Sequence, residues 1–205
     1  MLPGRPQLIK CPSCGMYQQR GTLLSGNTFG AVFYTDGKCI APMLPEFPRF
    51  IRCPKCKAFF VINDSLIQEQ EQDNTNIDEI SYVQFLEIDE YHQAIRAGLY
   101  NGGEDDVLSL RISLWRAYND IVRNGNDIAD KSLYEDNCKK ILAELCKGTS
   151  EDENRLMCAE LWRNIGSFDK CRKLLGEISQ PDKYKNVISA INTACDTQNT
   201  STVVF

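Results

Sequence analysis

The chain has 205 residues, of which 42% are apolar and 25% are charged, with a formal net charge of −5. This composition excludes wholesale disorder, and no apolar run approaches the roughly 18 residues that a membrane-spanning helix needs. Residues 1–62 hold 8 Lys and Arg against 2 Asp and Glu, whereas residues 63–205 hold 15 against 26. Such a shift in charge predicts two parts with different roles.

The ten cysteines are a high count for a chain of this length. The first residues show no apolar stretch after their charge, so we expect no secretory signal and a cytoplasmic location. Disulfides are not expected in such a reducing setting, and the cysteines therefore need another explanation.

Four of the cysteines form two C-P-x-C units, Cys11 with Cys14 and Cys53 with Cys56, separated by 38 residues. A C-x-x-C turn brings two thiolates to one metal, and Zn²⁺ prefers four tetrahedral ligands. The spacing therefore predicts one metal site made by all four cysteines. Gly15 suits the left-handed residue that often closes such a turn.

Two alternatives to zinc follow from the same motif. Iron is the alternative metal, because a rubredoxin site also uses four cysteines in two such turns. A thioredoxin-like redox pair would stand at a helix N-terminus in a βαβ unit. Here both pairs follow short β-like runs, at residues 7–10 and 49–52, which disfavours redox catalysis.

The segment between the cysteine pairs is predicted to form strands and turns. Asp36-Gly37 is a hairpin signal, and prolines at 42, 45 and 48 interrupt regular structure before strands return at residues 50–52 and 58–62. We interpret residues 1–63 as a β zinc ribbon with a hairpin inserted at residues 21–48. Residues 26–30 lack the Gly-Lys-Ser/Thr ending of a phosphate loop, so we expect a structural turn there, and Cys39 is expected to be a small buried residue.

An acidic segment follows the ribbon. Residues 63–80 contain six acids and no base, which predicts a solvated linker over 64–80 and a domain boundary within it. A short strand over 80–86 and a helix over 89–99 are expected next. His92, the only histidine, lies in that helix and is expected to have a surface or packing role rather than to bind metal.

From Glu104 onward the apolar residues recur with a helical period. Five helices are predicted between residues 104 and 194, separated by Gly125, Gly148, Gly166 and Pro181. Ser132 with Glu135 and Ser150 with Glu153 are predicted capping boxes at the starts of the second and third. Short loops between helices predict stacked antiparallel hairpins. Four further cysteines lie on or beside apolar helix faces and are expected in the core: Cys138, Cys146, Cys158 and Cys171.

Residues 156–175 resemble a tetratricopeptide repeat. Ala159 is the small residue that allows close helix approach, Trp162 is the aromatic that follows, Gly166 makes the turn, and Cys171 stands where alanine is usual. The usual final proline is displaced to Pro181. We therefore interpret residues 81–197 as an all-α domain of tetratricopeptide-like hairpins and the whole fold as α+β.

The whole chain resembles a group of uncharacterised bacterial proteins that join an N-terminal zinc ribbon to tetratricopeptide-like helices. The resemblance rests on the two C-P-x-C units, residues 26–30 and 35–37, residues 41–45, and the helix over 110–120. It implies zinc and this architecture. It implies no activity and no catalytic residue.

Three classes of function compete. We expect a non-enzymatic module that binds another protein or a peptide, because a metal-stabilised ribbon and helical hairpins both present surfaces. The alternative is nucleic-acid binding through the basic ribbon. An enzyme is disfavoured, because nothing assembles a nucleophile with a base. The tail, residues 198–205, is expected to be frayed or ordered only by a crystal, with capture by a sheet edge as its alternative.

Overall fold

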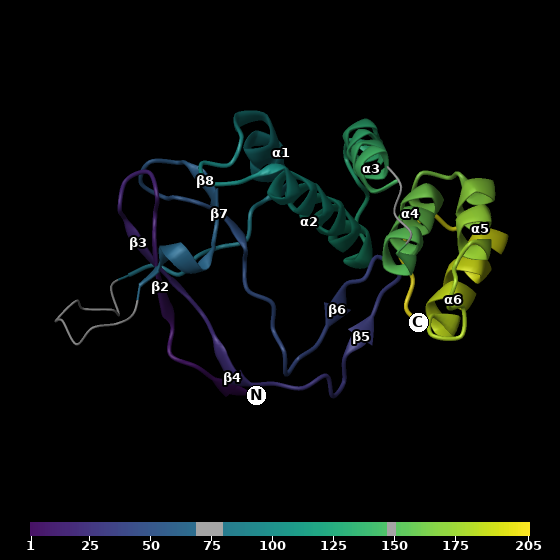
Figure 1. Cartoon of the computed structure of the whole chain (residues 1–205), viewed down its shortest axis with the longest axis horizontal. Coiled ribbons are helices and arrows are strands. Elements are labelled where there is room, and N and C mark those ends of the chain that lie inside the picture. Colours follow the sequence, from purple (N-terminus) through teal and green to yellow (C-terminus); the bar gives the residue numbers. More distant parts are fainter. Residues whose placement is uncertain (69–79, 147–150) are drawn as a thin grey trace. The chain divides into compact units, whose positions relative to one another are not determined.

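The computed structural model describes residues 1–68, 80–146 and 151–205. Short strands come first and helices follow, so the fold is mixed α+β, in the predicted order (Figure 1). No described helix is long and apolar enough to cross a membrane. The strands are β1 (Leu2–Pro3), β2 (Gln7–Lys10), β3 (Tyr17–Arg20), β4 (Leu23–Ser25), β5 (Val32–Phe33), β6 (Cys39–Ile40), β7 (Phe50–Arg52), β8 (Phe59–Val61) and β9 (Ile67–Gln68). The α-helices are α1 (Ile88–Ala97), α2 (Glu104–Arg123), α3 (Lys131–Leu145), α4 (Asp152–Asn164), α5 (Phe168–Gly176) and α6 (Lys185–Asp196).

Two compact units share the chain. The first comprises Met1–Gly30 and Ala41–Arg111, and the second comprises Ala31–Ile40 and Ile112–Phe205. This division differs from the predicted domains 1–63 and 81–197. Ala31–Ile40, part of the expected ribbon, belongs to the helical unit, whereas residues 81–111 belong to the first unit.

The first unit contains a three-stranded antiparallel sheet with β2 at its centre. Ile9 on β2 is opposite Gln18 on β3 and Ile67 on β9. A 3₁₀ turn, Asp64–Leu66, leads into β9, so residues 67–68 belong to the sheet and do not form the start of a linker. The rest of the predicted acidic linker lies mainly outside the described residues, at 69–79.

A second hairpin, β7–β8, supplies the other half of this unit's core. Ile51 on β7 is opposite Phe60 on β8, and both side chains are at most 1% exposed. Apolar residues from the two hairpins pack with two of the four cysteines, so the predicted metal ligands are part of the core. The buried cluster is Ile9, Cys11, Ile51, Cys53, Phe60, Ile62 and Val83.

Residues beyond 80 attach to the first unit through the backbone. In place of the predicted strand over 80–86, Tyr82 forms an isolated bridge with Gln19, whose N–H and C=O bond to Ser81 and Val83. Helix α1 follows, opened by a capping box between Glu87 and Glu90. The bridge between Gln19 and Tyr82 joins residues far apart in the sequence, which is why a boundary placed at the linker misses it.

The β5–β6 hairpin belongs to the second unit because Asp36 is anchored on α2. The Asp36 carboxylate accepts hydrogen bonds from Asn119 (2.9 Å) and Arg123 (2.8 Å), and its backbone carbonyl accepts one from Arg116 (3.2 Å). Asp36 is 2% exposed. The predicted Asp36-Gly37 turn is therefore also a buried electrostatic anchor.

Helices α3 to α6 form the rest of the second unit. Asp130 caps α3 by accepting from the Leu133 N–H (3.1 Å), so the predicted capping residue Ser132 lies inside the helix. Ser150, the other predicted cap, lies outside the described residues. Helices α4 and α5 pack as an antiparallel hairpin, and the buried cluster that they share with α6 is Ala159, Cys171, Leu175, Ile178, Ile191 and Cys195.

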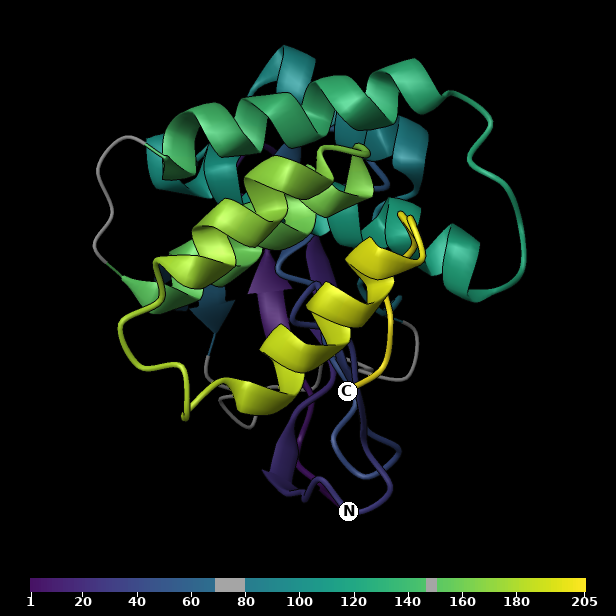
Figure 2. The same cartoon turned by 90° about the vertical axis from the view of Figure 1, so that its right-hand side faces the viewer.

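The tail is held on the second unit, which corrects the expectation of a frayed end. It turns back after α6 (Figure 2), and Val204 forms an antiparallel bridge with Tyr34. Capture beside a strand, the alternative for this segment, is what the structure shows. Tyr34 directly follows β5 and lies about 170 residues before Val204, so no local pattern could indicate this pairing.

Candidate metal centre

Each cysteine pair lies in a tight turn that follows a strand. The Cys11 N–H donates to the Met16 carbonyl (2.8 Å), and the Gly15 N–H donates to the Cys11 carbonyl (2.9 Å). In the second turn, the Cys53 N–H donates to Ala58 (2.9 Å) and the Lys57 N–H to Cys53 (2.9 Å). The two turns thus have the same hydrogen-bond pattern, as expected for two matching halves of one site.

The last residue of each turn is left-handed. Gly15 has φ of +73°, as predicted from the sequence, and Lys57 occupies the same position in the second turn with φ of +63°. A side chain at such a φ meets the backbone, at a cost of roughly 1 kcal/mol or more. The second turn therefore carries strain that the first turn avoids, and the sequence offers no signal of it beyond the alignment of the two motifs.

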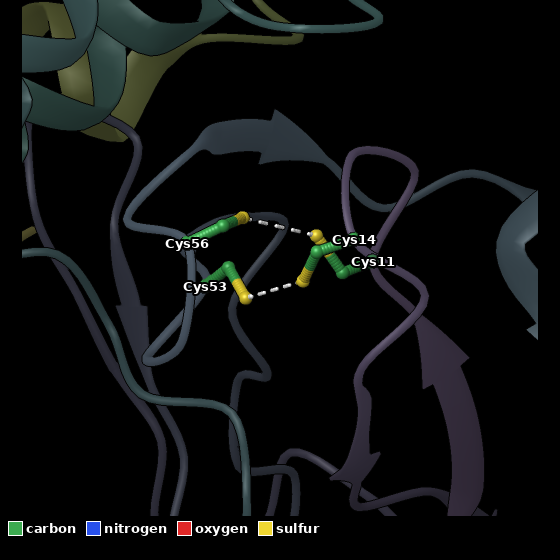
Figure 3. Close-up of side chains that lie close together, drawn as sticks. All are labelled: Cys11, Cys14, Cys53 and Cys56. Carbon is green, nitrogen blue, oxygen red and sulfur yellow. Dashed lines mark hydrogen bonds between the residues drawn. The ribbon is translucent and has the colours of Figure 1, made fainter.

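The four sulfur atoms gather at one point between the turns (Figure 3). All four Sγ atoms lie within 4.8 Å of one another. The Sγ atoms of Cys11 and Cys56 are 3.7 Å apart, and those of Cys14 and Cys53 are 3.6 Å apart. A tetrahedral ion with metal–sulfur bonds of about 2.3 Å separates its sulfurs by about 3.8 Å. The observed spacing therefore fits a four-thiolate centre.

Burial makes two of the four thiols, Cys11 and Cys53, poor anions without a cation nearby. Burial raises the pKa of Cys11 to about 12, opposed by the backbone N–H groups of Cys14 and Ser13, and it also raises the pKa of Cys53. Cys56 is exposed, and the backbone N–H of Ala58 lowers its pKa to about 6. A bound divalent cation would offset the cost of burying thiolates at Cys11 and Cys53.

The four sulfur atoms come from two turns, and four thiolates are the number that a tetrahedral zinc ion takes. Four thiolates leave no open position for substrate or water, which is the pattern of structural rather than catalytic zinc. Softness of the ligands suits zinc or iron and disfavours magnesium or calcium. The donor set thus fits a structural metal that fastens β2–β3 to β7–β8.

The remaining sequence candidates lie elsewhere. His92 is half-buried on α1, and Cys39 is half-buried on β6 in the second unit. Two close thiol pairs occur in the helical unit: Cys146 with Cys158 (3.1 Å) and Cys171 with Cys195 (3.5 Å). Among the residues that the structure describes, the Cys11–Cys14–Cys53–Cys56 cluster is the one group of three or more potential ligands close enough to hold an ion.

A scan against models of protein families gave no match, and neither did searches of curated proteins and of solved structures. The resemblance to bacterial proteins with a zinc ribbon and helical repeats therefore stays a prediction.

Proposed function

We propose that this chain is a zinc-binding, non-enzymatic interaction protein in which the metal is structural. The observation that carries the proposal is the convergence of Cys11, Cys14, Cys53 and Cys56 on one point inside the core of the first unit. In this proposal β2–β3 and β7–β8 are the two halves of a zinc ribbon. A structural metal stabilises the fold around it, and contacts with a partner are then made by other residues on the surface.

The helical unit supports the interaction part of the proposal. Ala159 on α4 and Cys171 on α5 are both 0% exposed, so small residues stand where the two helices pack closely, as in a tetratricopeptide hairpin. Gly166, with φ of +77°, makes the turn between them. Stacked helical hairpins commonly bind peptides on an extended surface. We propose that this unit provides the surface for another protein.

Ion pairs hold three of the eight basic residues of segment 1–62, which weighs against nucleic acid as the main partner. In the first unit, Arg49 pairs with Asp106 (2.6 Å) and Arg52 pairs with Glu90 (3.1 Å). In the second unit, Lys38 pairs with Asp120. Phosphate binding depends on Lys and Arg side chains that displace the counterions of the nucleic-acid backbone. These ion pairs reduce the number of side chains that are free to do so.

Affinity capture with the full chain from its native host tests the proposal when nuclease and salt are varied. A protein partner that stays bound after nuclease treatment supports an interaction module. Retention that disappears with nuclease, or binding to DNA or RNA that weakens steeply with salt, would instead support the nucleic-acid alternative. Metal analysis on the same sample tests the zinc site separately.

A further inference from the structure

The segment after α6 lies on the second unit as an extended strand with its own set of partners. Gln198 adopts φ of +51°, and the Asn199 N–H donates to the Ala194 carbonyl (2.8 Å), which reverses the chain at the end of α6. Residues 199–205 then pass α4 and reach the β5–β6 hairpin, where Val204 is paired with Tyr34. One turn is therefore the covalent link between this strand and the helices.

The hairpin holds the far end of the segment through the backbone. The Thr35 N–H donates to the Val203 carbonyl (2.9 Å), and the Phe205 N–H donates to the Phe33 carbonyl (3.2 Å). The Val203 N–H donates to the Thr35 hydroxyl (3.1 Å). In an antiparallel bridge these bonds flank the paired residues, so the N–H of Val204 points away from the hairpin.

Two side chains of α4 hold the near end, again through the backbone. Arg163 donates to the carbonyls of Asn199 and Ser201, the latter at 2.8 Å, and Asn164 donates to the carbonyl of Thr200 (2.8 Å). Three successive carbonyls are thus bound by side-chain donors. A donor set of this kind recognises an extended main chain and is tolerant of side-chain identity.

These donors are fixed in place by a buried network. Arg163 forms an ion pair with Glu160, and both side chains are 0% exposed. The Thr35 hydroxyl donates to Glu160 (2.7 Å), which links the hairpin end of the site to the α4 end. The Trp115 indole donates to Asn164 (3.0 Å), so a tryptophan reports on the same network. Buried networks with satisfied partners are rigid, which is what a pre-formed binding site requires.

The segment itself adds little to the core of the unit. Val204 is 57% exposed and Phe205 is 44% exposed, and no residue of 199–205 belongs to the buried helical cluster. Phe205 contacts Phe33 with ring centroids 6.3 Å apart. The segment can therefore leave without opening the packing of α4, α5 and α6, whereas its departure leaves Arg163 without two acceptors.

We infer that the surface formed by residues 33–35 and by Arg163 and Asn164 is a peptide-binding site, which residues 199–205 occupy in the resting chain. Its ligand class is an extended peptide of a partner protein that offers main-chain carbonyls to Arg163 and Asn164 and an apolar residue to Phe33. The peptide adds a strand beside β5 and satisfies Arg163. This inference rests on the proposed interaction role and names the surface that carries it.

A free peptide must compete with the tethered residues 199–205 for the site, and this competition can be measured. A segment attached through one turn has an effective concentration of about millimolar or higher, so a free peptide at micromolar concentration does not displace it. Loosening the segment should open the site. Proline at 203 removes the N–H that bonds to Thr35, whereas proline at 204 removes an N–H that faces away.

The test compares three full-length chains: wild type, Val203→Pro and Val204→Pro. The probe is a dye-labelled synthetic peptide with the sequence of residues 199–205, and its affinity is measured by fluorescence anisotropy. We expect the Val203→Pro chain to bind about tenfold or more tightly than either other chain. A Trp162→Phe background leaves Trp115 as the one tryptophan, and its emission should change as the peptide binds.

Equal affinity of all three chains, or no binding by any, would overturn the inference provided that the Val203→Pro chain shows a cooperative helical transition. If that chain does not fold, hydrogen exchange on the wild-type chain decides the matter. With millimolar unlabelled peptide, we expect the Phe205 amide to exchange faster while the Thr35 amide stays protected. Unchanged exchange at Phe205 would refute the site.

The experiments can show separately whether the peptide site is wrong and whether the interaction role is wrong. If the chain captures a nuclease-resistant protein partner but the peptide experiments fail, the partner binds another surface. If the peptide binds only where the tail is loosened, residues 33–35 and α4 form the site whatever the capture experiment yields.

Discussion

The two units of this chain differ in what lies inside their cores: converging cysteines in the first and buried ion pairs in the second. The first has strands of two to four residues, and its buried cluster includes two of four converging cysteines. The second has long helices and, beside its apolar cluster, buried charges at Asp36, Glu160 and Arg163. Short strands bury little apolar surface by themselves, so a bound metal would stabilise the first unit, whereas the second unit also has polar anchors in its core. The difference predicts that each unit fails for its own reason.

Removal of one metal ligand should have the largest effect, and it should fall on the first unit. Cys11→Ser or Cys53→Ser leaves three thiolates for an ion that prefers four, and structural zinc supplies roughly 10–16 kcal/mol of apparent folding free energy. We expect loss of metal and of order in the first unit. Because both tryptophans, Trp115 and Trp162, lie in the second unit, their emission should report a preserved cooperative transition there.

Cys39→Ser is the matched control, because Cys39 lies between the two turns in sequence but in the second unit in space. It should keep the metal. Helical circular dichroism should fall only in part in the ligand variants, since α1 and the start of α2 belong to the first unit. Collapse of tryptophan emission together with metal loss would show that the two units do not fail separately.

Breaking the Asp36 anchor should have the next largest effect, and it should fall on the second unit. Asp36→Ala removes the fully buried partner of the Arg123 guanidinium, whose side chain is 7% exposed, and leaves it with the more exposed Asp120. Removing one member of a buried ion pair costs about 3–5 kcal/mol. The measurement is the denaturant midpoint of tryptophan emission, with metal content expected to stay at the wild-type level.

Glu135→Ala provides the comparison for an exposed pair. Glu135 and Lys139 are 47% and 58% exposed, and such pairs contribute about 0–1 kcal/mol. If Asp36→Ala and Glu135→Ala shift the midpoint equally, the Asp36 anchor does not stabilise the helical unit.

Acid should weaken the second unit through Asp152. The backbone N–H of Ser179, its hydroxyl and the N–H of Gln180 hydrogen-bond to this carboxylate and lower its pKa to about 2. Because the folded pKa lies below the unfolded value of about 3.9, the stabilisation is present above about pH 4 and is lost as the pH falls toward 2. Asp152→Asn should therefore lower the melting temperature at neutral pH and converge with wild type near pH 2. Parallel melting curves at all pH values would contradict this role.

The smallest effects should distinguish the two cysteine turns from each other. Gly15→Ala places a side chain at φ of +73°, where its Cβ meets only ordinary contact with Lys10 (3.8 Å), so strain alone should cost about 1 kcal/mol. Lys57→Gly relieves the corresponding strain and should raise stability by about 0.5–1 kcal/mol. The measurement is metal retention against a competing chelator. If both variants retained metal more strongly than wild type, or both more weakly, the proposed difference in backbone strain between the two turns would be wrong.

What the sequence could predict was local. The C-P-x-C spacing identified the four cysteines that meet, Gly15 identified a left-handed turn, and periodicity located the helices. The division into units was not predictable, because it depends on Asp36 meeting Arg123 and on Tyr82 meeting Gln19. The site of the tail was missed for the same reason, since Arg163 in a helix pattern gives no sign that it binds carbonyls of residues 199–201.

Metal analysis of the full chain, purified without chelator and paired with a count of reactive thiols, tests the central claim most directly. We predict one equivalent of zinc per chain, with Cys11, Cys14, Cys53 and Cys56 protected from alkylation until the metal is removed. One equivalent of iron would keep the four-cysteine centre and change only its metal. Less than about a tenth of an equivalent of any metal, with these four thiols freely alkylated, would contradict a structural four-thiolate centre.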